Sequence, residues 1–355
     1  MTNFLHSQKT ALRGMLLMTV LLFSACSRGP RPLPDCVAPA FLVPGDKIAL
    51  LTPSYATPME NVDSAAAILR GWGFEPVIGP HVGETYRGAY AGTPAQRVED
   101  LRWALRDDSI KAILCSRGGY GTIHFMDMLR KEDFCASPKW LVGYSDITTL
   151  HEMETRSGVM SIHGPMGNSL VQTGGRDHSS TLVRDLLMGK VPVYKTDPHP
   201  ENIPGTATGT LVGGNLCSFS PILGTWADAT SGKDFILFIE EVEENMSHID
   251  RMINTLILNG VFDRCKGVIL GEFTDCGGGG MDYDSVEQLI CSYLKEYDIP
   301  VCCDFPCGHS QVNVPLVMGA KVRLTVSEQG AEVRFLMDGT QVPVHAFAAD
   351  TLLVE

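Results

Sequence analysis

The chain has 355 residues, of which 44% are hydrophobic and 19% are charged. This composition predicts a globular protein with a substantial core rather than a disordered chain, and the length allows two domains. The formal net charge is −13 and no basic stripe offsets it. Nucleic-acid binding is therefore not expected, because neutralising phosphates requires clustered Lys and Arg.

The N-terminus has the pattern of an export signal. Lys9 and Arg13 precede an apolar run over residues 15–23, which small residues and Cys26 follow. The run is shorter than the roughly 20 residues that a membrane-spanning helix needs. Its ending resembles a bacterial lipobox, so residues 1–25 are predicted to be a lipoprotein signal peptide. Lipidated Cys26 would then anchor a periplasmic protein to a membrane. A plain secretory signal is the alternative.

A tether and a first domain are expected next. Residues 26–40 are rich in Pro and small residues, which is typical of a tether. Apolar runs predict strands at 47–54, 75–80, 111–116 and 139–145, and helical patterns cover 61–74, 93–107, 123–130 and 146–158. Strands and helices alternate, so residues 41–167 are predicted to form a Rossmann-like α/β domain with a parallel sheet. Ligands of such sheets bind at the carboxyl ends of the strands.

The second half of the chain has a different character. The polar stretch 168–205 is predicted to link two domains, and residues 206–355 are predicted to form a C-terminal mixed α/β domain rich in strands. Its strands are expected at 206–216, 234–242, 266–273, 299–305, 316–326 and 331–338, with helices at 248–260 and 285–297.

Ser145, in the segment LVGYSDITTLH, is a candidate nucleophile. An apolar strand runs through Gly143 into this serine and directly into a helix, the context in which a sharp turn exposes a serine hydroxyl above a sheet. The N–H groups at the helix start would favour a developing negative charge. The segment lacks the second Gly of the usual hydrolase motif. The alternative is that Ser145 or Asp146 merely caps the helix.

A nucleophilic serine needs a base and an acid that orients the base. His309, in the loop FPCGHSQVN after an apolar strand, is the candidate base, and His163 is its main internal competitor. Glu240 and Glu241 end the apolar strand DFILFIEEV. Because side chains alternate along a strand, one of the two glutamates is expected in the site and the other in solvent.

The glycine-rich loop SRGGYGT follows the predicted strand at 111–116. Gly118 and Gly119 allow close approach of the backbone to a ligand, and their N–H groups could form an oxyanion hole together with that of Asp146. Arg117 is suited to bind a substrate carboxylate, or else is an exposed loop arginine. The loop matches neither nucleotide-binding glycine pattern.

A cysteine cluster near His309 raises the question of a metal. Cys302, Cys303 and Cys307 lie close to it in sequence, but their spacing matches no two-pair zinc pattern, so no metal is expected. Most of the other cysteines lie in apolar runs, where a cysteine usually serves as a small buried hydrophobe.

The motifs together resemble the LD-carboxypeptidases (muramoyltetrapeptide carboxypeptidases), to which the microcin-immunity peptidases are related. The resemblance rests on AILCSRGGYG, LVGYSDITTLH followed by IHGPM, GTLVGGNL, LFIEEVEENMSHIDRM, GVILGEF and FPCGH with PLVMGAKVRL, in this order. It covers roughly residues 41–340 and implies two α/β domains with the active site between them. Family members often form homodimers, and the sequence does not decide between monomer and dimer.

The resemblance also implies roles for individual residues. Ser145, Glu240 and His309 would form a Ser–Glu–His triad. Gly118 or Gly119 and Asp146 would supply the oxyanion hole, and Arg117 and Tyr120 are the candidate substrate-binding residues. The implied reaction releases the terminal D-alanine from peptidoglycan stem tetrapeptides without a metal or cofactor. A microcin-immunity-like peptidase acting on another acyl substrate and a muropeptide-binding lipoprotein without activity remain alternatives.

Overall fold

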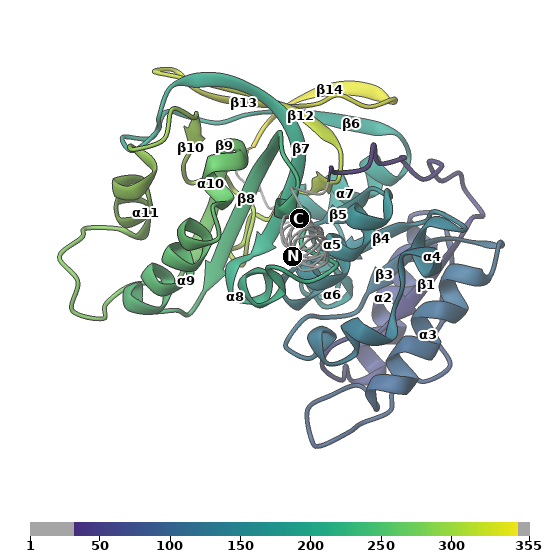
Figure 1. Cartoon of the computed structure of the whole chain (residues 1–355). Coiled ribbons are helices and arrows are strands. Elements are labelled where there is room, and N and C mark those ends of the chain that lie inside the picture. The colour runs from purple at the N-terminus through teal and green to yellow at the C-terminus, as the bar shows by residue number, and fades with distance from the viewer. Residues whose placement is uncertain (1–31, 347–355) are drawn as a thin grey trace, which may run out of the picture. The chain divides into compact units, whose positions relative to one another are not determined.

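A computed structural model describes residues 32–346 (Figure 1). The predicted signal peptide, Cys26 and the first part of the tether lie outside the described residues. Residues 36–40 already contact the folded chain: Val37 bridges to Val159, and Trp140 Nε1 donates to the carbonyl oxygen of Ala40 at 3.1 Å. The end of the predicted tether therefore packs on the first sheet.

The first sheet has six strands in the order β11-β5-β4-β3-β1-β2. Its strands are β1 (Lys47–Leu51), β2 (Glu75–Ile78), β3 (Ile110–Cys115), β4 (Trp140–Gly143), β5 (Ser161–His163) and β11 (Leu316–Met318). All neighbours pair in parallel except β11, which is antiparallel to β5. Nearly every residue of β1, β3 and β4 is buried, as expected for a parallel sheet covered on both faces.

Helices cover this sheet in two groups. The helices are α2 (Met59–Gly71), α3 (Pro94–Arg106), α4 (Lys131–Cys135), α5 (Thr148–Ser157), α6 (Gly167–Thr173) and α7 (His178–Leu187). α2 packs against α6, whereas α4 contacts both α3 and α5. Thr93 caps α3 as predicted, because its side chain accepts from Gln96 N. The helix expected over 123–130 is instead a 3-10 helix, η1 (Thr122–Met128), whose last carbonyl oxygen accepts from Arg102 at 2.7 Å.

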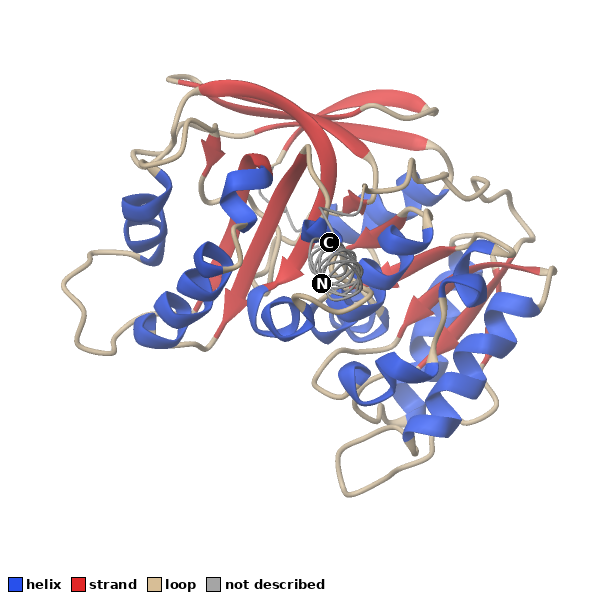
Figure 2. Ribbon diagram, viewed as in Figure 1, coloured by secondary structure: helices blue, strands red, loops and turns tan. Residues whose placement is uncertain are grey.

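The second sheet has eight strands in the order β10-β9-β8-β7-β12-β13-β6-β14 (Figure 2). Its strands are β6 (Lys190–Lys195), β7 (Gly205–Asn215), β8 (Phe235–Val242), β9 (Cys265–Thr274), β10 (Val301–Cys302), β12 (Lys321–Ser327), β13 (Gly330–Phe335) and β14 (Thr340–His345). The accompanying helices are α8 (Leu216–Phe219), η3 (Ser220–Ile222), η4 (Ala229–Ser231), α9 (Met246–Leu258), α10 (Val261–Arg264) and α11 (Val286–Leu294). β7 to β10 are parallel and the strands beyond β7 are mostly antiparallel, which confirms the mixed, strand-rich α/β class.

Two segments depart from the expected layout. The stretch 168–205, expected to be a linker, contains α7 and also β6, which pairs with β13 and β14 inside the second sheet. The single strand expected over 316–326 is two strands in different sheets, separated at Gly319 with φ 79°. Residues from Leu33 onward accordingly belong to one compact unit.

Strand β8 separates two hydrophobic cores. Ile236 and Phe238 belong to the core shared with the first sheet, whereas Leu237 and Ile239 belong to the core under α9 and α11. Side chains two residues apart on a strand point to the same face, so Glu240 lies on the same face of β8 as Phe238. No helix among residues 32–346 is both long and apolar enough to cross a membrane.

Candidate active site

Ser145 lies on a sharp turn between β4 and the helices that follow it. β4 ends at Gly143, a 3-10 turn η2 (Ser145–Ile147) begins at the serine, and α5 follows directly. Ser145 has φ 65°, in the left-handed region that costs a non-glycine residue energy. A Cβ on Gly143 would lie 2.9 Å from the side chain of Ile147, so the turn requires glycine there. This is the geometry of a nucleophile elbow.

The helix-cap alternative does not hold. Neither η2 nor α5 has a side-chain cap, and the N-cap position of α5 is Ile147. The buried Asp146 carboxylate instead accepts from Ser54 Oγ and from Thr122 N, the latter at 2.9 Å. Asp146 therefore ties the elbow to the end of the glycine-rich loop. Its own N–H is among the first of a helical turn, where N–H groups lack intrahelical partners.

The glycine-rich loop lies directly against the serine. A Cβ on Gly118 would be 2.8 Å from Ser145 Cβ and 3.1 Å from its Oγ, closer than real side chains approach. Gly119 has φ 115°, and a Cβ there would collide with the ring of Tyr55 at 2.4 Å. Gly118 is thus required for the loop to approach the serine, and Gly119 for the loop to pack against Tyr55.

Glu240 and His309 form a short hydrogen bond. His309 Nδ1 lies 2.7 Å from Glu240 Oε2, and the Glu240 side chain is 0% exposed against 16% for His309. An ionised carboxylate only accepts, so Nδ1–H donates and Nε2 is left for another partner. Burial lowers the pKa of His309, but the hydrogen bond and charge of Glu240 outweigh it, and the net pKa is raised.

His309 also lies beside the serine elbow. The ring of Tyr144, the residue before Ser145, meets the His309 ring edge-on with centroids 4.9 Å apart. Within residues 32–346, Ser145 Oγ and His309 make no direct hydrogen bond. In structures without substrate such contacts are often long and shorten only in the reacting complex.

His163, the predicted competitor of His309, occupies a different environment. It is fully buried, and its ring lies 5.0 Å from the Phe238 ring and 6.0 Å from that of Tyr144. Neither ring nitrogen has a hydrogen-bond partner among the described residues, and burial lowers its pKa well below the usual value. Glu240 pairs with His309 and not with His163.

The expectation that one of the two glutamates is solvated is wrong, because Glu240 and Glu241 are both buried. The Glu241 side chain turns away from Glu240 but is buried, and it accepts from Asn215 Nδ2, Cys217 N and Val242 N. These three hydrogen bonds, rather than water, satisfy the carboxylate. Glu241 therefore holds the end of β7 and the start of α8 against β8.

Arg117 and Tyr120 lie on the loop as predicted. The Arg117 guanidinium is 5.6 Å from the centroid of the Tyr55 ring and forms no ion pair with any described residue. Tyr120 is 49% exposed, with its ring 5.0 Å from that of His124. An arginine without an ionic partner, beside the half-buried ring of Tyr55, can receive a carboxylate.

Contacts between α5 and β7 were not predicted from the sequence. Glu152 accepts from Gly213 N at 2.8 Å and from Ala229 N at 3.2 Å, and Thr148 Oγ1 accepts from Asn215 N at 2.9 Å. Burial raises the pKa of Glu152 to about 8 despite these two hydrogen bonds. A buried glutamate inside a helix is the only local signal, and it does not identify a partner 61 residues away.

The cysteine cluster does not assemble around His309. Cys303 faces Cys291, whereas Cys307 Sγ contacts Asn313. Among residues 32–346 no three His, Cys, Asp or Glu side chains are placed to hold a metal ion.

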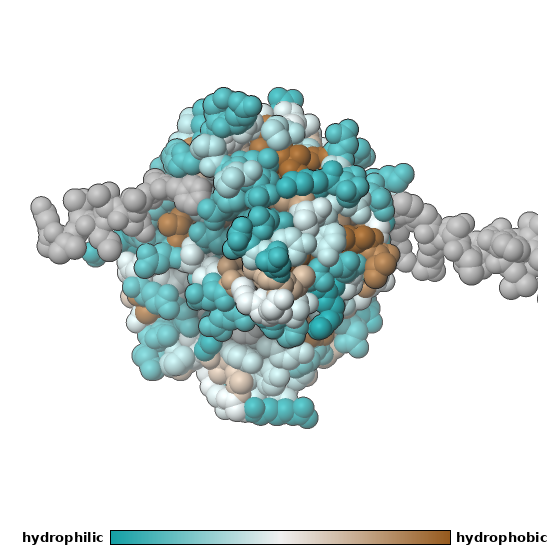
Figure 3. All heavy atoms as spheres, turned by 90° about the vertical axis from the view of Figure 1, so that its left-hand side faces the viewer, coloured by the Kyte–Doolittle hydropathy of each residue, from teal (hydrophilic) through white to brown (hydrophobic). Residues whose placement is uncertain are grey.

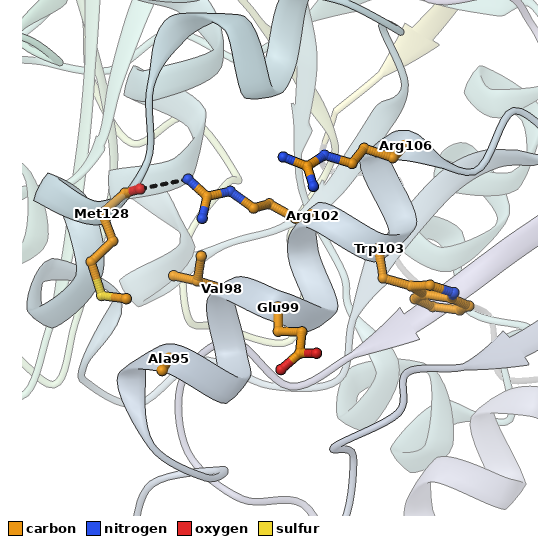
Figure 4. Close-up of a pocket in the computed structure, with 7 residues that line it drawn as sticks. All are labelled: Ala95, Val98, Glu99, Arg102, Trp103, Arg106 and Met128. Carbon is orange, nitrogen blue, oxygen red and sulfur yellow. Dashed lines mark hydrogen bonds between the residues drawn. The ribbon is translucent and has the colours of Figure 1, made fainter.

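A cavity of about 390 Å³ lies elsewhere, on the outer side of α3 (Figure 4). It is lined by Ala95, Val98, Glu99, Arg102, Trp103, Arg106 and Met128. None of the candidate site residues lines it.

Comparison with known proteins supports the same assignment for both halves. Residues 48–164 match the model of the LD-carboxypeptidase N-terminal domain, and residues 208–324 match that of the LD-carboxypeptidase C-terminal domain. A protein of Streptomyces coelicolor named as a carboxypeptidase is 34% identical, over 82% of this chain and 94% of its own. The murein tetrapeptide carboxypeptidase of Pseudomonas aeruginosa is 30% identical, over 75% and 89%.

Solved structures agree on the fold. The crystal structure of muramoyltetrapeptide carboxypeptidase from Oxalobacter formigenes superposes with a TM-score of 0.74 at 24% identity, covering 83% of this chain and all of the other. The microcin C7 self-immunity protein MccF in the wild-type apo state superposes with a TM-score of 0.73 at 22% identity, covering 85% of this chain and all of the other. The family resemblance seen in the sequence is confirmed: the chain belongs to the LD-carboxypeptidase family.

Proposed function

We propose that the protein is a serine peptidase that removes the terminal D-alanine from peptidoglycan stem tetrapeptides, with Ser145, Glu240 and His309 as its catalytic triad. The observation that carries the proposal is the 2.7 Å hydrogen bond between Glu240 and His309, next to a serine held at φ 65°. The relative from Pseudomonas aeruginosa, named murein tetrapeptide carboxypeptidase, supports the substrate class.

Each of the three proposed triad residues has its own role in the reaction. Ser145 Oγ attacks the carbonyl carbon of the scissile L–D peptide bond while His309 Nε2 takes its proton. Glu240 keeps Nδ1 protonated and stabilises the imidazolium. The C–N bond then breaks, His309 protonates the departing amine of D-alanine, and water releases the tripeptide from Ser145 in a second round.

The glycine-rich loop is proposed to bind two negative charges, the oxyanion of the reaction intermediate and the terminal carboxylate of the substrate. The N–H groups of Gly118 or Gly119 and of Asp146 are proposed to bind the oxyanion, supported by the closeness of Gly118 to Ser145. Arg117 is proposed to bind the terminal carboxylate, beside Tyr120. Recognition of a free C-terminal carboxylate is what makes a peptidase a carboxypeptidase.

The assay is direct. The purified protein is incubated with a muropeptide tetrapeptide, and the product is examined by mass for loss of one alanine. Loss of alanine supports the proposal. Binding of the intact peptide without loss favours a binding protein, and no effect on the tetrapeptide combined with hydrolysis of acyl-sulfamoyl nucleosides favours a microcin-immunity type of peptidase.

We further propose that the protein is exported and anchored through a lipid on Cys26, in the periplasm. The N-terminal sequence pattern supports this. Mass analysis of the mature N-terminus tests it: cleavage before a lipidated Cys26 is expected, and Cys26→Ser should abolish both. An uncleaved chain would exclude the proposal.

A further inference from the structure

Two thiols face each other in the core under α9 and α11. Cys291 Sγ and Cys303 Sγ are 3.5 Å apart, and the residues are 0% and 2% exposed. Cys291 lies on α11 and Cys303 directly follows β10. Of the ten cysteines in residues 32–346, no other two have their sulfur atoms in contact.

We propose that Cys291 and Cys303 form an intramolecular disulfide when the chain folds in an oxidising compartment. A disulfide has an S–S distance of about 2.05 Å, so the sulfur atoms must approach by about 1.5 Å. Rotations about the two Cα–Cβ bonds can contribute to this approach. The surroundings are apolar, and no charged side chain separates the two atoms.

The oxidant is a low-molecular-weight or protein disulfide. The thiolate of one cysteine attacks a sulfur of the oxidant and releases its first thiolate, giving a mixed disulfide. The thiolate of the second cysteine then attacks the protein sulfur and releases the second. The two cysteines lose two electrons and two protons, and the oxidant gains both as two thiols.

The surroundings of the two cysteines in the folded protein determine at which stage the disulfide can form. The hydrogen bond with Cys291 and burial both raise the pKa of Cys303, so the reactive thiolate is disfavoured once the core is closed. The face that carries α11 presents a mostly hydrophilic surface with small, scattered hydrophobic patches (Figure 3). Because Cys291 and Cys303 are 0% and 2% exposed beneath this surface, oxidants in solvent do not reach the two thiols in the folded protein. The disulfide is therefore expected to form while the chain folds, before the core closes. Once the core has closed, the disulfide is protected from reductants in solvent.

The two cysteines lie where a disulfide would stabilise the loop that carries His309. β10 is a two-residue strand at the edge of the second sheet; it pairs with β9, and Val301 forms an isolated antiparallel bridge with Ile203. The chain leaves it through Cys303 and reaches His309 six residues later. A covalent link to α11 would tie the start of this loop to a helix by a bond that stays closed when backbone hydrogen bonds open locally.

The test is refolding of the full chain. Denatured protein is refolded with oxidised and reduced glutathione or, in parallel, with a thiol reductant alone, and free thiols are then alkylated under denaturing conditions. Peptide mapping with fragmentation should find Cys291 linked to Cys303 in the first sample only. The oxidised protein should melt higher, by a shift on the order of 5 °C, because the link closes a loop whose ends are 12 residues apart.

Matched variants separate this pair from its neighbours. Cys291→Ala and Cys303→Ala should each abolish the link and the melting difference, whereas Cys302→Ala, next in sequence and equally buried, should retain both. Alkylation of both cysteines in refolded wild-type protein overturns the proposal, as does a link between other cysteines. If an alanine variant does not refold, the wild-type peptide map decides by itself. Mass mapping does not depend on the proposed activity, so the two can fail separately.

Discussion

Thr148 and Asn215 connect the serine elbow to the strand that adjoins Glu240. The Thr148 hydroxyl accepts from Asn215 N at 2.9 Å, and Asn215 pairs in register with Glu240 across β7 and β8. Thr148 lies three residues after Ser145. Two residues 67 positions apart thus set the spacing between the candidate nucleophile and the candidate acid.

Replacing this hydroxyl should therefore affect both stability and activity. Thr148→Val leaves a buried N–H without a partner and should lower the free energy of unfolding by about 1–3 kcal/mol. The turnover number should fall more than substrate affinity, because positioning is lost. Thr148→Ser keeps the hydroxyl and is the matched control. Equal activity of the valine and serine variants would contradict the positioning role.

Ser145→Ala should reduce hydrolysis of the tetrapeptide by about 10⁴-fold or more, since no other group supplies the nucleophile. Ser145→Gly should be equally inactive but more stable than Ser145→Ala by about 1 kcal/mol, because glycine adopts φ 65° without strain. Mass-detected turnover and thermal melting measure the two effects. Retained activity in either variant would show that the nucleophile lies elsewhere.

Glu240→Gln should slow the reaction by about 10³-fold or more and move its pH dependence. His309 must be neutral to act as a base, and Glu240 raises its pKa above the usual histidine value. Without that charge, burial lowers the pKa, so the acidic limb of the kcat/KM profile should move to lower pH.

Glu241→Gln is the control for this shift, because Glu241 contacts Asn215 and not His309. It should move the acidic limb less. A limb that does not respond to Glu240→Gln would mean that another group titrates in the profile.

Gly118→Ala tests the close approach of the loop. The added Cβ would lie 2.8 Å from Ser145 Cβ, so the loop or the serine must move, and activity should fall by about 10²-fold or more. Gly71→Ala is the matched control, since a Cβ there meets nothing within 4 Å. Steady-state kinetics on both variants give the comparison, and similar activities would rule out a tight loop–serine contact.

The buried carboxyl of Glu152 should make the folded protein less stable as the pH rises towards 8. Burial raises its folded pKa to about 8 from the ordinary value of 4.5, so the folded state holds a proton that the unfolded state releases. The free energy of unfolding should consequently fall as the pH rises from about 4.5, the ordinary pKa, to about 8, and level off above the folded pKa. Denaturant titrations across this range should show a smaller slope for Glu152→Gln, which cannot ionise. An unchanged slope would assign the effect to other buried carboxyls.

Local chemistry explains why much of the first domain could be predicted. The apolar run ending at Gly143, the helix after it and the Thr93 cap of α3 depend on residues within a few positions of one another. Periodicity and turn composition report such features directly. They also indicated the elbow at Ser145, although only the structure reveals its φ of 65°.

Features that depend on distant partners could not be predicted in this way. Alternation along β8 sends Glu240 and Glu241 to opposite faces, but nothing local says that both faces are buried. The turn at Gly119 and the assignment of β11 to the first sheet likewise depend on packing against remote residues.

The motifs of the chain were enough to recognise the family, the α/β class and the candidate residues Ser145, Glu240 and His309. The tertiary structure decided which histidine pairs with Glu240, because His309 and Glu240 are 69 residues apart and meet at 2.7 Å only when the second sheet is formed. Folding also buries His163, with its ring centroid 6.0 Å from that of Tyr144, and links α5 to β7. The sequence specifies the type of each side chain, whereas a hydrogen bond between distant residues forms only when folding brings the two side chains together.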